Sequence, residues 1–207
     1  MIICMARPDG KVITMSGEAY LPEQVRAIFS GLREVRGKRE LADALAREIE
    51  RFDILDLQRI SAGIEREIRG LPSPYREQIH PYFMEQLFGR YFQALKIHGD
   101  GLLNSISGEI KDPDLFRKYC DMLASREWDG DEGLESLGPQ YSGYYHLLSC
   151  LAMFVFDEPG HPTGMPFPGG FTVERKGDGY YCPIRDKEKD VPFSICNFCP
   201  ARQGEVP

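Results

Sequence analysis

The sequence predicts a mainly α protein: a helical bundle of about six helices that carries a small C-terminal β-hairpin and an irregular cysteine-rich tail. Two observations support this prediction. Apolar residues recur every three or four positions through most of residues 1–157, which is the spacing of one helix face. Residues 159–170 then hold four prolines and four glycines, a composition that neither a helix nor a central strand tolerates. We therefore expect a helical bundle over residues 1–157 and a Gly/Pro-rich loop, hairpin and tail over residues 158–207, packed on the bundle as one structural domain.

The first half of the bundle is predicted from three amphipathic segments. Residues 21–35 place apolar side chains at helical spacing, and apolar residues recur every four positions over 41–49. A third segment covers 57–68, with Asp56 as its predicted N-cap and Gly70 just past its end.

The second half of the bundle is predicted from helix-start signals and one apolar run. Ser73-Pro74 places a cap residue before a proline at the first helical position, and it opens the longest helical stretch. Asp112-Pro113 repeats this signal. Residues 140–156 are apolar nearly all round, so we expect that helix at the centre of the bundle.

Outside the helices, the sequence predicts a loop over 128–138 and one hairpin. Residues 171–175 alternate apolar and polar side chains, 176–179 supply a turn, and 180–182 form the returning strand. This hairpin delivers a cysteine at its end. The rest of the tail is predicted to be irregular.

Three cysteines near the end of the chain have the most specific chemical spacing. They are Cys182, Cys196 and Cys199, arranged as C-P-x12-C-x2-C-P. A gap of two residues lets both sulfurs of a Cys-x-x-Cys pair point at one centre. The spacing therefore predicts a metal or iron–sulfur site to which the tail supplies three of four donors.

The fourth donor must come from elsewhere in the chain, and Cys150 on the apolar helix is the leading candidate. His146 lies four residues earlier on the same helix face, as a ligand or as a donor to a ligand. His161 in the Gly/Pro loop is a further candidate. Cys120 belongs to a regular amphipathic helix and Cys4 lies near the N-terminus, so both are weaker choices.

Several functions remain open for these cysteines. The leading hypothesis is a structural zinc ion that fastens the tail onto the bundle. An alternative is a [4Fe–4S] cluster with an open iron coordination position, in an enzyme or redox protein. The thiols could also be inert core residues, or Cys196 and Cys199 a redox-active pair. No catalytic residue is assigned, and whether the chain is an enzyme stays open.

A different kind of function is suggested by the Gly/Pro-rich loop. Its irregular backbone could line a binding surface, with tyrosines converging beside it. The protein would then be an interaction module for a protein partner. The candidate tyrosines are Tyr141, Tyr144, Tyr145, Tyr180 and Tyr181.

Composition narrows the setting and the partners. Acidic residues outnumber basic ones, 32 to 25, and the basic residues form no stripe, so nucleic acid is not an expected partner. The longest apolar run, 147–156, covers half of the roughly 20 residues that a membrane-spanning helix needs. The apolar N-terminus is too short for a signal peptide, and six cysteines are too few for a disulfide scaffold. We expect a cytoplasmic protein without a membrane segment.

Several stretches of the chain resemble a protein family known chiefly from methanogenic archaea, domain of unknown function 2115. The resemblance covers most of the chain from about residue 40. It implies a cytoplasmic archaeal protein in which the cysteines and the Gly/Pro loop are signature positions, and it implies no activity. The stretches are Phe52-Asp53-Ile54-Leu55-Asp56-Leu57, Leu71-Pro72, Tyr75-Arg76-Glu77, Phe83, Phe88-Gly89-Arg90-Tyr91, the loop from Gly160-His161-Pro162 to Gly169-Gly170, Tyr181-Cys182-Pro183 and the closing Cys196 and Cys199.

Overall fold

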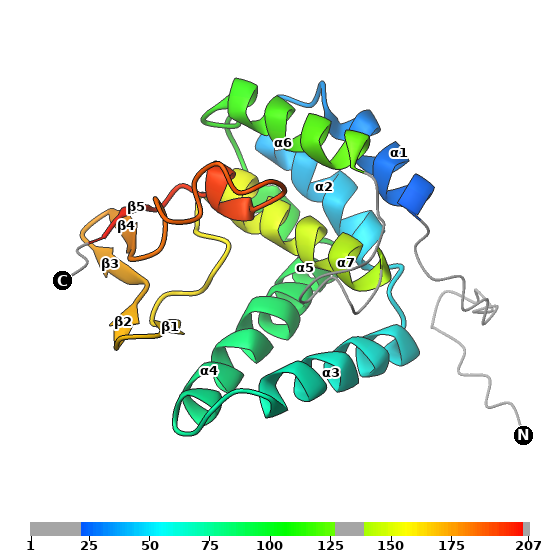
Figure 1. The fold of residues 1–207 in the computed structure, drawn as a ribbon. Helices are drawn as coiled ribbons and strands as arrows, with labels where there is room; N and C mark the ends of the chain where they lie inside the picture. Colours follow the sequence, from blue (N-terminus) through cyan, green and yellow to red (C-terminus); the bar gives the residue numbers. More distant parts are fainter. Residues whose placement is uncertain (1–21, 127–138, 205–207) are drawn as a thin grey trace, which may run out of the picture.

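The computed structural model describes residues 22–126 and 139–204, and its fold is mainly α, as predicted (Figure 1). The loop predicted over 128–138 and the N-terminal segment with Cys4 lie outside these residues. The helices are α1 (Pro22–Leu32), α2 (Lys38–Ile49), α3 (Ile54–Arg69), α4 (Tyr75–Met84), the π-helical turn η1 (Glu85–Gly89), α5 (Arg90–Gly99), the 3₁₀ turn η2 (Leu102–Ser105), α6 (Pro113–Ser125), α7 (Pro139–Cys150), the π-helical turn η4 (Leu151–Val155) and the 3₁₀ turn η5 (Ile195–Phe198). With α4, η1 and α5 counted as one continuous rod, the described residues form six long helices.

Helix α7 and its extension η4 lie at the centre of the bundle, as predicted for residues 140–156 (Figure 1). Side chains on every face are buried, from Tyr141 and Tyr144 to Leu151 and Phe154. Helix α2 packs against α7 and η4, and its Leu41 is fully buried. The prediction holds because a helix that is apolar all round can only be stable when neighbours cover every face.

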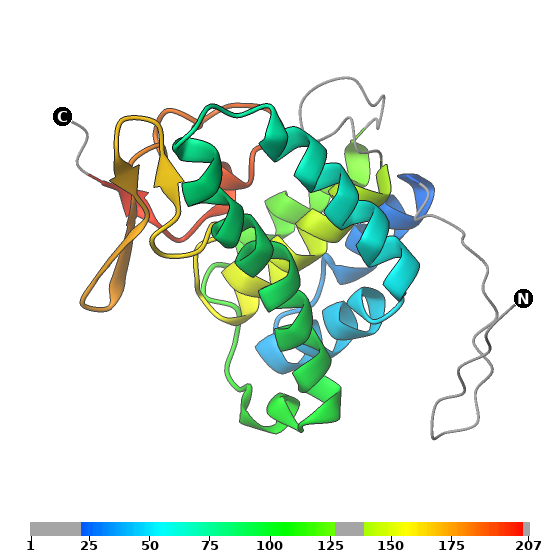
Figure 2. The same ribbon diagram turned by 90° about the horizontal axis from the view of Figure 1, so that it is seen from below.

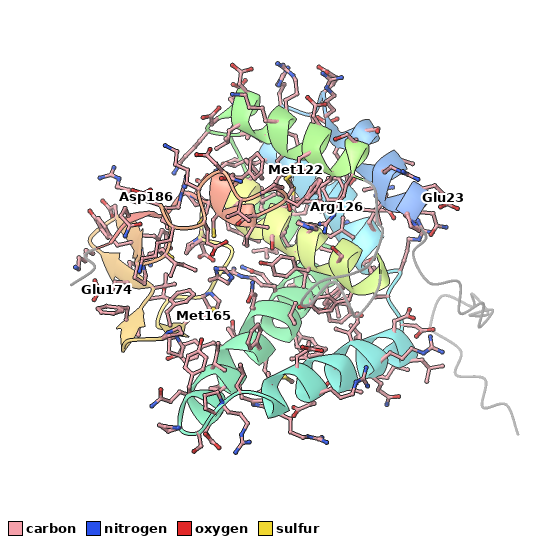
Figure 3. The ribbon with its side chains drawn as sticks, in the orientation of Figure 1. Glu23, Met122, Arg126, Met165, Glu174 and Asp186 are labelled. Carbon is pink, nitrogen blue, oxygen red and sulfur yellow. The ribbon has the colours of Figure 1, made fainter. Side chains whose placement is uncertain are left out.

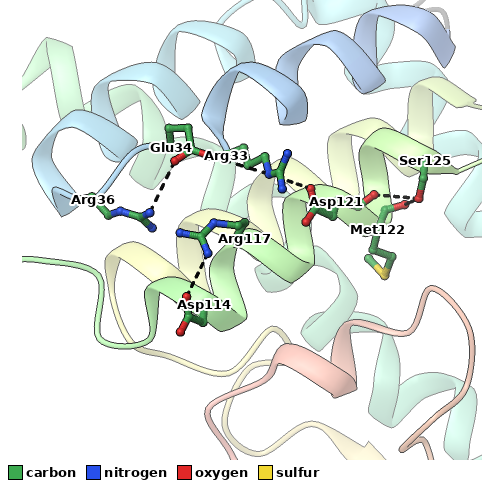
Figure 4. A network of polar contacts seen from close by, with 8 residues as sticks. All are labelled: Arg33, Glu34, Arg36, Asp114, Arg117, Asp121, Met122 and Ser125. Carbon is green, nitrogen blue, oxygen red and sulfur yellow. Dashed lines mark hydrogen bonds and ion pairs between the residues drawn. The ribbon is translucent and has the colours of Figure 1, made fainter.

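Helices α1 and α6 pack side by side along one edge of the bundle (Figures 1 and 4). Phe29 of α1 meets the ring of Tyr119 on α6 edge to face, with centroids 5.8 Å apart. Arg33 pairs with Asp121 at 3.0 Å on the exposed side of the same contact. The apolar contact carries most of the stabilisation, because an exposed ion pair contributes no more than about 1 kcal/mol.

Two of the predicted helix starts need correction. Helix α3 begins after Asp53, whose carboxylate accepts hydrogen bonds from the amides of Leu55 and Asp56, and Asp56 returns a bond to the Asp53 amide. The predicted cap, Asp56, is therefore the third residue of the helix, where it completes a capping box with Asp53. Helix α4 begins at Tyr75, with Pro74 rather than Ser73 at the N-cap position.

The predicted start of α6 is confirmed. The Asp112 carboxylate accepts from the amide of Leu115 at 2.9 Å, and Pro113 is the first helical residue. Proline suits that position because the first amides of a helix have no partner within the helix.

The longest predicted helix is present as α4, η1 and α5, and it crosses under α7 beside α3 (Figure 2). The π-helical turn η1 in its middle was not predicted. The Tyr144 hydroxyl of α7 donates to the carbonyl of Leu87 within this turn at 2.8 Å. A π-helical turn adds one residue to the helix and often marks a functional site.

The C-terminal part contains more β-structure than the single predicted hairpin. The hairpin is confirmed as β3 (Glu174–Lys176) and β4 (Gly179–Cys182), with Cys182 as the last residue of β4. Strand β2 (Phe171–Thr172), however, pairs with β1 (Pro166–Phe167) in a separate two-stranded sheet. The tail adds β5 (Arg202–Gln203), parallel to β4, so it is less irregular than predicted.

The tail folds back onto the bundle through η5. Ile195 and Phe198 belong to the main core cluster, and Phe198 meets Tyr119 of α6 edge to face at 5.1 Å. Gly160 allows this approach, because a Cβ atom there would stand 2.5 Å from Cδ1 of Ile195. In the parts of the chain that the structure describes, no helix has the length and apolar character needed to cross a membrane.

Candidate functional site

The three tail cysteines lie within electrostatic range of one another. Cys182 closes β4, Cys196 lies in η5 and Cys199 follows that turn. A charge on Cys199 raises the pKa of both Cys182 and Cys196, and Cys182 also acts on Cys196. The pairing of β4 with β5 causes this convergence, because it brings the end of the tail alongside Cys182.

Backbone amides donate hydrogen bonds to two of these sulfurs. The amides of Ile184 and Arg185 lower the pKa of Cys182 by donating to its sulfur. The amides of Ala201 and Gly160 do the same for Cys199. In both places the next residue is a proline, so the first amide to reach the sulfur is two residues on. Such hydrogen bonds favour a thiolate over a thiol, as at metal-binding cysteines.

Burial still outweighs these hydrogen bonds in the metal-free thiols. It raises the pKa of Cys196 to about 11, and it also raises the pKa of Cys182 and Cys199. A redox-active pair needs a lowered thiol pKa, so the arrangement does not favour that alternative. The Arg185 guanidinium opposes the effect of burial at Cys182 and Cys199, and among the described residues its Nε has no hydrogen-bond partner.

Cys150, the leading candidate for fourth donor, has a different neighbourhood. It is fully buried on α7. Burial and the neighbouring Cys120 of α6 raise its pKa well above the ordinary value. Cys150 in turn acts on the hydroxyl of Tyr119. It therefore faces α6 and not the tail sulfurs.

His146 is held by protein partners at both ring nitrogens. Its Nε2 lies 3.3 Å from the guanidinium of Arg126, and Nδ1 lies 3.2 Å from the hydroxyl of Tyr119. Arginine can only donate, so Nε2 accepts and Nδ1 carries the proton that goes to Tyr119. The Tyr119 hydroxyl donates to the carbonyl of His146 at 2.9 Å. Burial, and then Arg126, lower the pKa of His146 to about 3, so it is neutral and has no nitrogen left for a metal.

His161, another candidate for the fourth donor, lies beside the tail cysteines. Its neighbour Gly160 donates an amide to Cys199, and His161 shares a pocket with Cys196. Its ring meets Phe167 edge to face at 6.0 Å. Burial lowers the pKa of His161 to about 4 and keeps the imidazole in the neutral form that binds metals.

The donors are close together, but they do not form a finished coordination shell. Within residues 22–126 and 139–204, no group of three or more His, Cys, Asp or Glu side chains is arranged to hold a metal ion.

A pocket of about 370 Å³ adjoins the cysteines, between α4, η1, α7 and the tail. Met165, from the Gly/Pro loop, lines it and lies between the strands and α4 (Figure 3). Gln86 of η1 also lines it and is buried. The sequence analysis did not single out Gln86, although a signal existed. It lies three residues after Phe83 and seven after Ile79, a polar residue on an apolar stripe.

A larger open groove of about 900 Å³ runs between the start of α4 and the Gly/Pro loop. Its walls include Tyr75 and Tyr82 from the helix and Phe167 from β1. The tyrosines predicted to converge at the loop do not all do so. Tyr141 and Tyr145 reach the smaller pocket, whereas Tyr180 and Tyr181 meet Arg175 and Lys176 on the hairpin.

Comparisons with known proteins agree with the resemblance noted in the sequence. A family model described as an uncharacterised protein conserved in archaea (DUF2115) matches residues 37–204. A UPF0305 protein of Methanothermobacter thermautotrophicus is 52% identical over 174 residues, covering 84% of this chain and 100% of that protein. A UPF0305 protein of Methanopyrus kandleri is 42% identical over 133 residues, covering 64% of this chain and 86% of that protein. No solved structure matches the chain significantly.

Proposed function

The chain belongs to the uncharacterised archaeal family DUF2115, and we propose that it is a metal-binding protein in which Cys182, Cys196 and Cys199 hold a structural zinc ion. One observation carries this proposal. Three cysteines from separate parts of the tail lie within electrostatic range, and backbone amides already donate to two of the sulfurs. Zinc favours this donor type, and ligation would add folding free energy to a tail with few regular hydrogen bonds.

Charge balance supports the same proposal. Three thiolates and one Zn²⁺ carry a net charge of about −1. The guanidinium of Arg185, which already acts on Cys182 and Cys199, would compensate that charge. Without a metal, burial keeps these thiols protonated, so binding would release protons.

For the fourth position we propose His161 in place of Cys150. Cys150 faces Cys120, and both nitrogens of His146 have partners. His161 follows the glycine whose amide reaches Cys199. A Cys₃His set is a common structural zinc site.

The proposal is tested by purifying the full chain without oxygen and measuring its metal content and absorption spectrum. About one zinc per chain and a colourless protein are expected. A brown protein with sulfur-to-iron absorption would contradict zinc and favour the [4Fe–4S] alternative, in which three cysteines leave one iron with an open coordination position. Protein with neither zinc nor iron would refute metal binding.

Serine variants identify the ligands. Cys199→Ser should lose most of the bound zinc, and His161→Ala should lower zinc affinity. Cys120→Ser is the matched control, because Cys120 is also a free cysteine but is fully buried on α6. Cobalt substitution gives a second readout, since the intensity of its sulfur charge-transfer band reports the number of bound thiolates. Equal zinc content in Cys120→Ser and Cys199→Ser would contradict the ligand set.

A second candidate function is binding of an extended protein segment in the groove beside the Gly/Pro loop. The observation that favours it is the apolar wall formed by Tyr75, Tyr82 and Phe167. Selection from a displayed peptide library tests it, with Tyr82→Ala as the variant. Peptides enriched on the parent chain should also be enriched on the double variant Cys196→Ser/Cys199→Ser. That result would show that peptide binding does not depend on the sulfurs. Equal enrichment on Tyr82→Ala would remove the groove as the site.

A further inference from the structure

The pocket of about 370 Å³ that adjoins the tail has aromatic walls and a polar interior. Phe83 of α4, Tyr145 of α7, Phe167 of β1 and Phe193 of the tail contribute rings from four separate segments. The volume lies within the range of small-molecule sites, which are mostly apolar with a few placed polar groups. Such walls suit a flat ring system, because aromatic side chains prefer stacked or edge-to-face contacts.

Gln86 gives this pocket an unused pair of hydrogen-bonding groups. Only 3% of its surface is exposed, yet neither Oε1 nor Nε2 has a hydrogen-bond partner among the described residues. The carboxamide lies close enough to Tyr145 to lower the pKa of that hydroxyl, but not at hydrogen-bond geometry. A buried polar group without a partner is rare in folded proteins and requires an explanation.

Tyr141 adds a second unused group from another element. Its side chain is 3% exposed, and its hydroxyl also lacks a partner among the described residues. Tyr141 lies on α7 and Gln86 on η1, and both line the same pocket. Two separate helical segments thus place residues with unsatisfied polar atoms in the lining of one pocket.

The charges around the pocket limit what can occupy it. Its described lining holds no lysine or arginine, although the guanidinium of Arg126 contacts two lining residues, His146 and Phe193. An anion would therefore find no counter-charge in the lining itself. A cation could pair with Glu188 and with Oε1 of Gln86, but it would leave the Nε2 donors unsatisfied. A neutral ligand with both a donor and an acceptor satisfies all of these groups.

We propose that this pocket binds a neutral, planar heterocycle whose edge carries an N–H group beside a C=O group, and that the Gln86 carboxamide hydrogen-bonds to this edge. Oε1 of Gln86 accepts from the ring N–H while Nε2 donates to the ring carbonyl, forming two parallel hydrogen bonds. The Tyr141 hydroxyl reaches a third polar atom of the ring, and the aromatic walls cover its faces. The pocket shares His161 and Cys196 with the proposed zinc site, but this inference rests on Gln86 and Tyr141, which are not proposed ligands.

Calorimetric titration of the full chain tests the proposal with uracil, hypoxanthine and alloxazine, which carry the same edge on one, two or three rings. At least one of them should bind. Its analogue methylated at the ring nitrogen should bind about tenfold more weakly or worse, because the analogue loses a hydrogen bond and leaves Oε1 buried without a partner. Failure of all three compounds to bind at millimolar concentration overturns the proposal, as does equal binding of the methylated analogue.

Variants of two of the three glutamines on this helical rod locate the binding. Gln86→Met keeps the side-chain length but removes both hydrogen-bonding atoms, so affinity should fall about tenfold or more while the thermal midpoint stays unchanged or rises. Gln78→Met is the matched control, because Gln78 lies on α4 with an exposed side chain that does not line this pocket. Unchanged affinity in Gln86→Met, or an equal loss in Gln78→Met, would place the ligand elsewhere and overturn the assignment.

Discussion

At the scale of single residues, each hydrogen bond in the chain Arg126–His146–Tyr119 has a defined donor and acceptor. Arg126 donates to Nε2, Nδ1 donates to the Tyr119 hydroxyl, and that hydroxyl donates to the His146 carbonyl. All three side chains are buried. Protonation of His146 would therefore place a second positive charge beside Arg126 inside the core.

This arrangement predicts acid sensitivity. The pKa of His146 is about 3 in the folded protein, against an ordinary 6.5. Between these pH values the unfolded chain binds a proton at His146 that the folded chain does not bind. The stabilisation is complete above about pH 6.5 and declines as the pH falls toward 3, by about 1.4 kcal/mol per pH unit. Urea unfolding of the parent chain and of His146→Gln at pH 7.5, 6 and 5 checks this.

The variant should show a smaller loss of unfolding free energy at low pH. Part of the dependence should remain, because burial also lowers the pKa of His161, to about 4. Identical pH dependence in the two proteins would show that His146 does not titrate as the structure implies.

At the scale of elements, η5 approaches the Gly/Pro loop closely at Gly160. Gly160 leaves room for Ile195, whose Cδ1 would lie 2.5 Å from any Cβ atom at that position. Close-packed interiors tolerate such additions poorly, so the loop and η5 must fit each other.

Gly160→Ala is therefore expected to lower the unfolding free energy by about 1–3 kcal/mol. Ile195→Val removes the clashing Cδ1, so the double variant should lose less than the sum of the two single changes. Gly31→Ala on α1 is the control, since it meets no atom within 4 Å and should stabilise by up to about 1 kcal/mol. Additive losses in the double variant would contradict the contact.

Helix types and approximate helix bounds were predictable from the sequence, whereas the local details were not. Asp53 and Asp56 both precede an apolar run, and periodicity alone does not decide which of two acids caps the helix. The π-helical turn η1 leaves no signal in a pattern of apolar residues, because Phe83 and Leu87 still fit helical spacing. Two-residue strands such as β1 depend on pairing with distant residues and have no local signature.

At the scale of the whole molecule, the tail joins the bundle through two apolar clusters. Phe198 packs on Tyr119 of α6, and Glu158 at the exit from η4 pairs with Arg90 at 2.6 Å. Asp157 pairs with Lys111 at 3.0 Å beside that exit. Ile195 and Phe198 thus belong to the main core of the bundle, whereas Met165, Val173, Cys182 and Ala201 form a second cluster with Ile79 of α4.

Because both clusters combine residues of the tail and of the helices, tail and bundle should unfold together. Phe198→Ala is expected to lower the unfolding free energy by about 3 kcal/mol. Phe92→Ala, at a side chain that is 59% exposed, should stay within about 0.5 kcal/mol of the parent. Far-UV circular dichroism follows the helices, and thiol labelling of Cys199 follows the tail. Labelling at a lower urea concentration than helix loss would show that the tail opens by itself.

The candidate site was only partly predictable, for reasons of the same kind. The spacing of Cys182, Cys196 and Cys199 identified the residues that converge, because β4 and β5 bring their ends together. The direction in which Cys150 faces depends on the packing of α7 against α6, which no local pattern encodes. Gln86 could not be identified from the sequence alone. A polar residue on an apolar stripe indicates a site only when the structure shows that its polar atoms have no hydrogen-bond partner.

The turn η1 also makes the polar lining of this pocket sensitive to small changes in chain length. A π-helical turn corresponds to one inserted residue within an α-helix. Deleting one residue between Glu85 and Gly89 would restore the regular ladder and remove the local displacement of the backbone at Gln86 and Leu87. Gln86 and the Leu87 carbonyl could then no longer both face α7. Relatives with and without that residue should therefore differ in what they bind while sharing the same bundle.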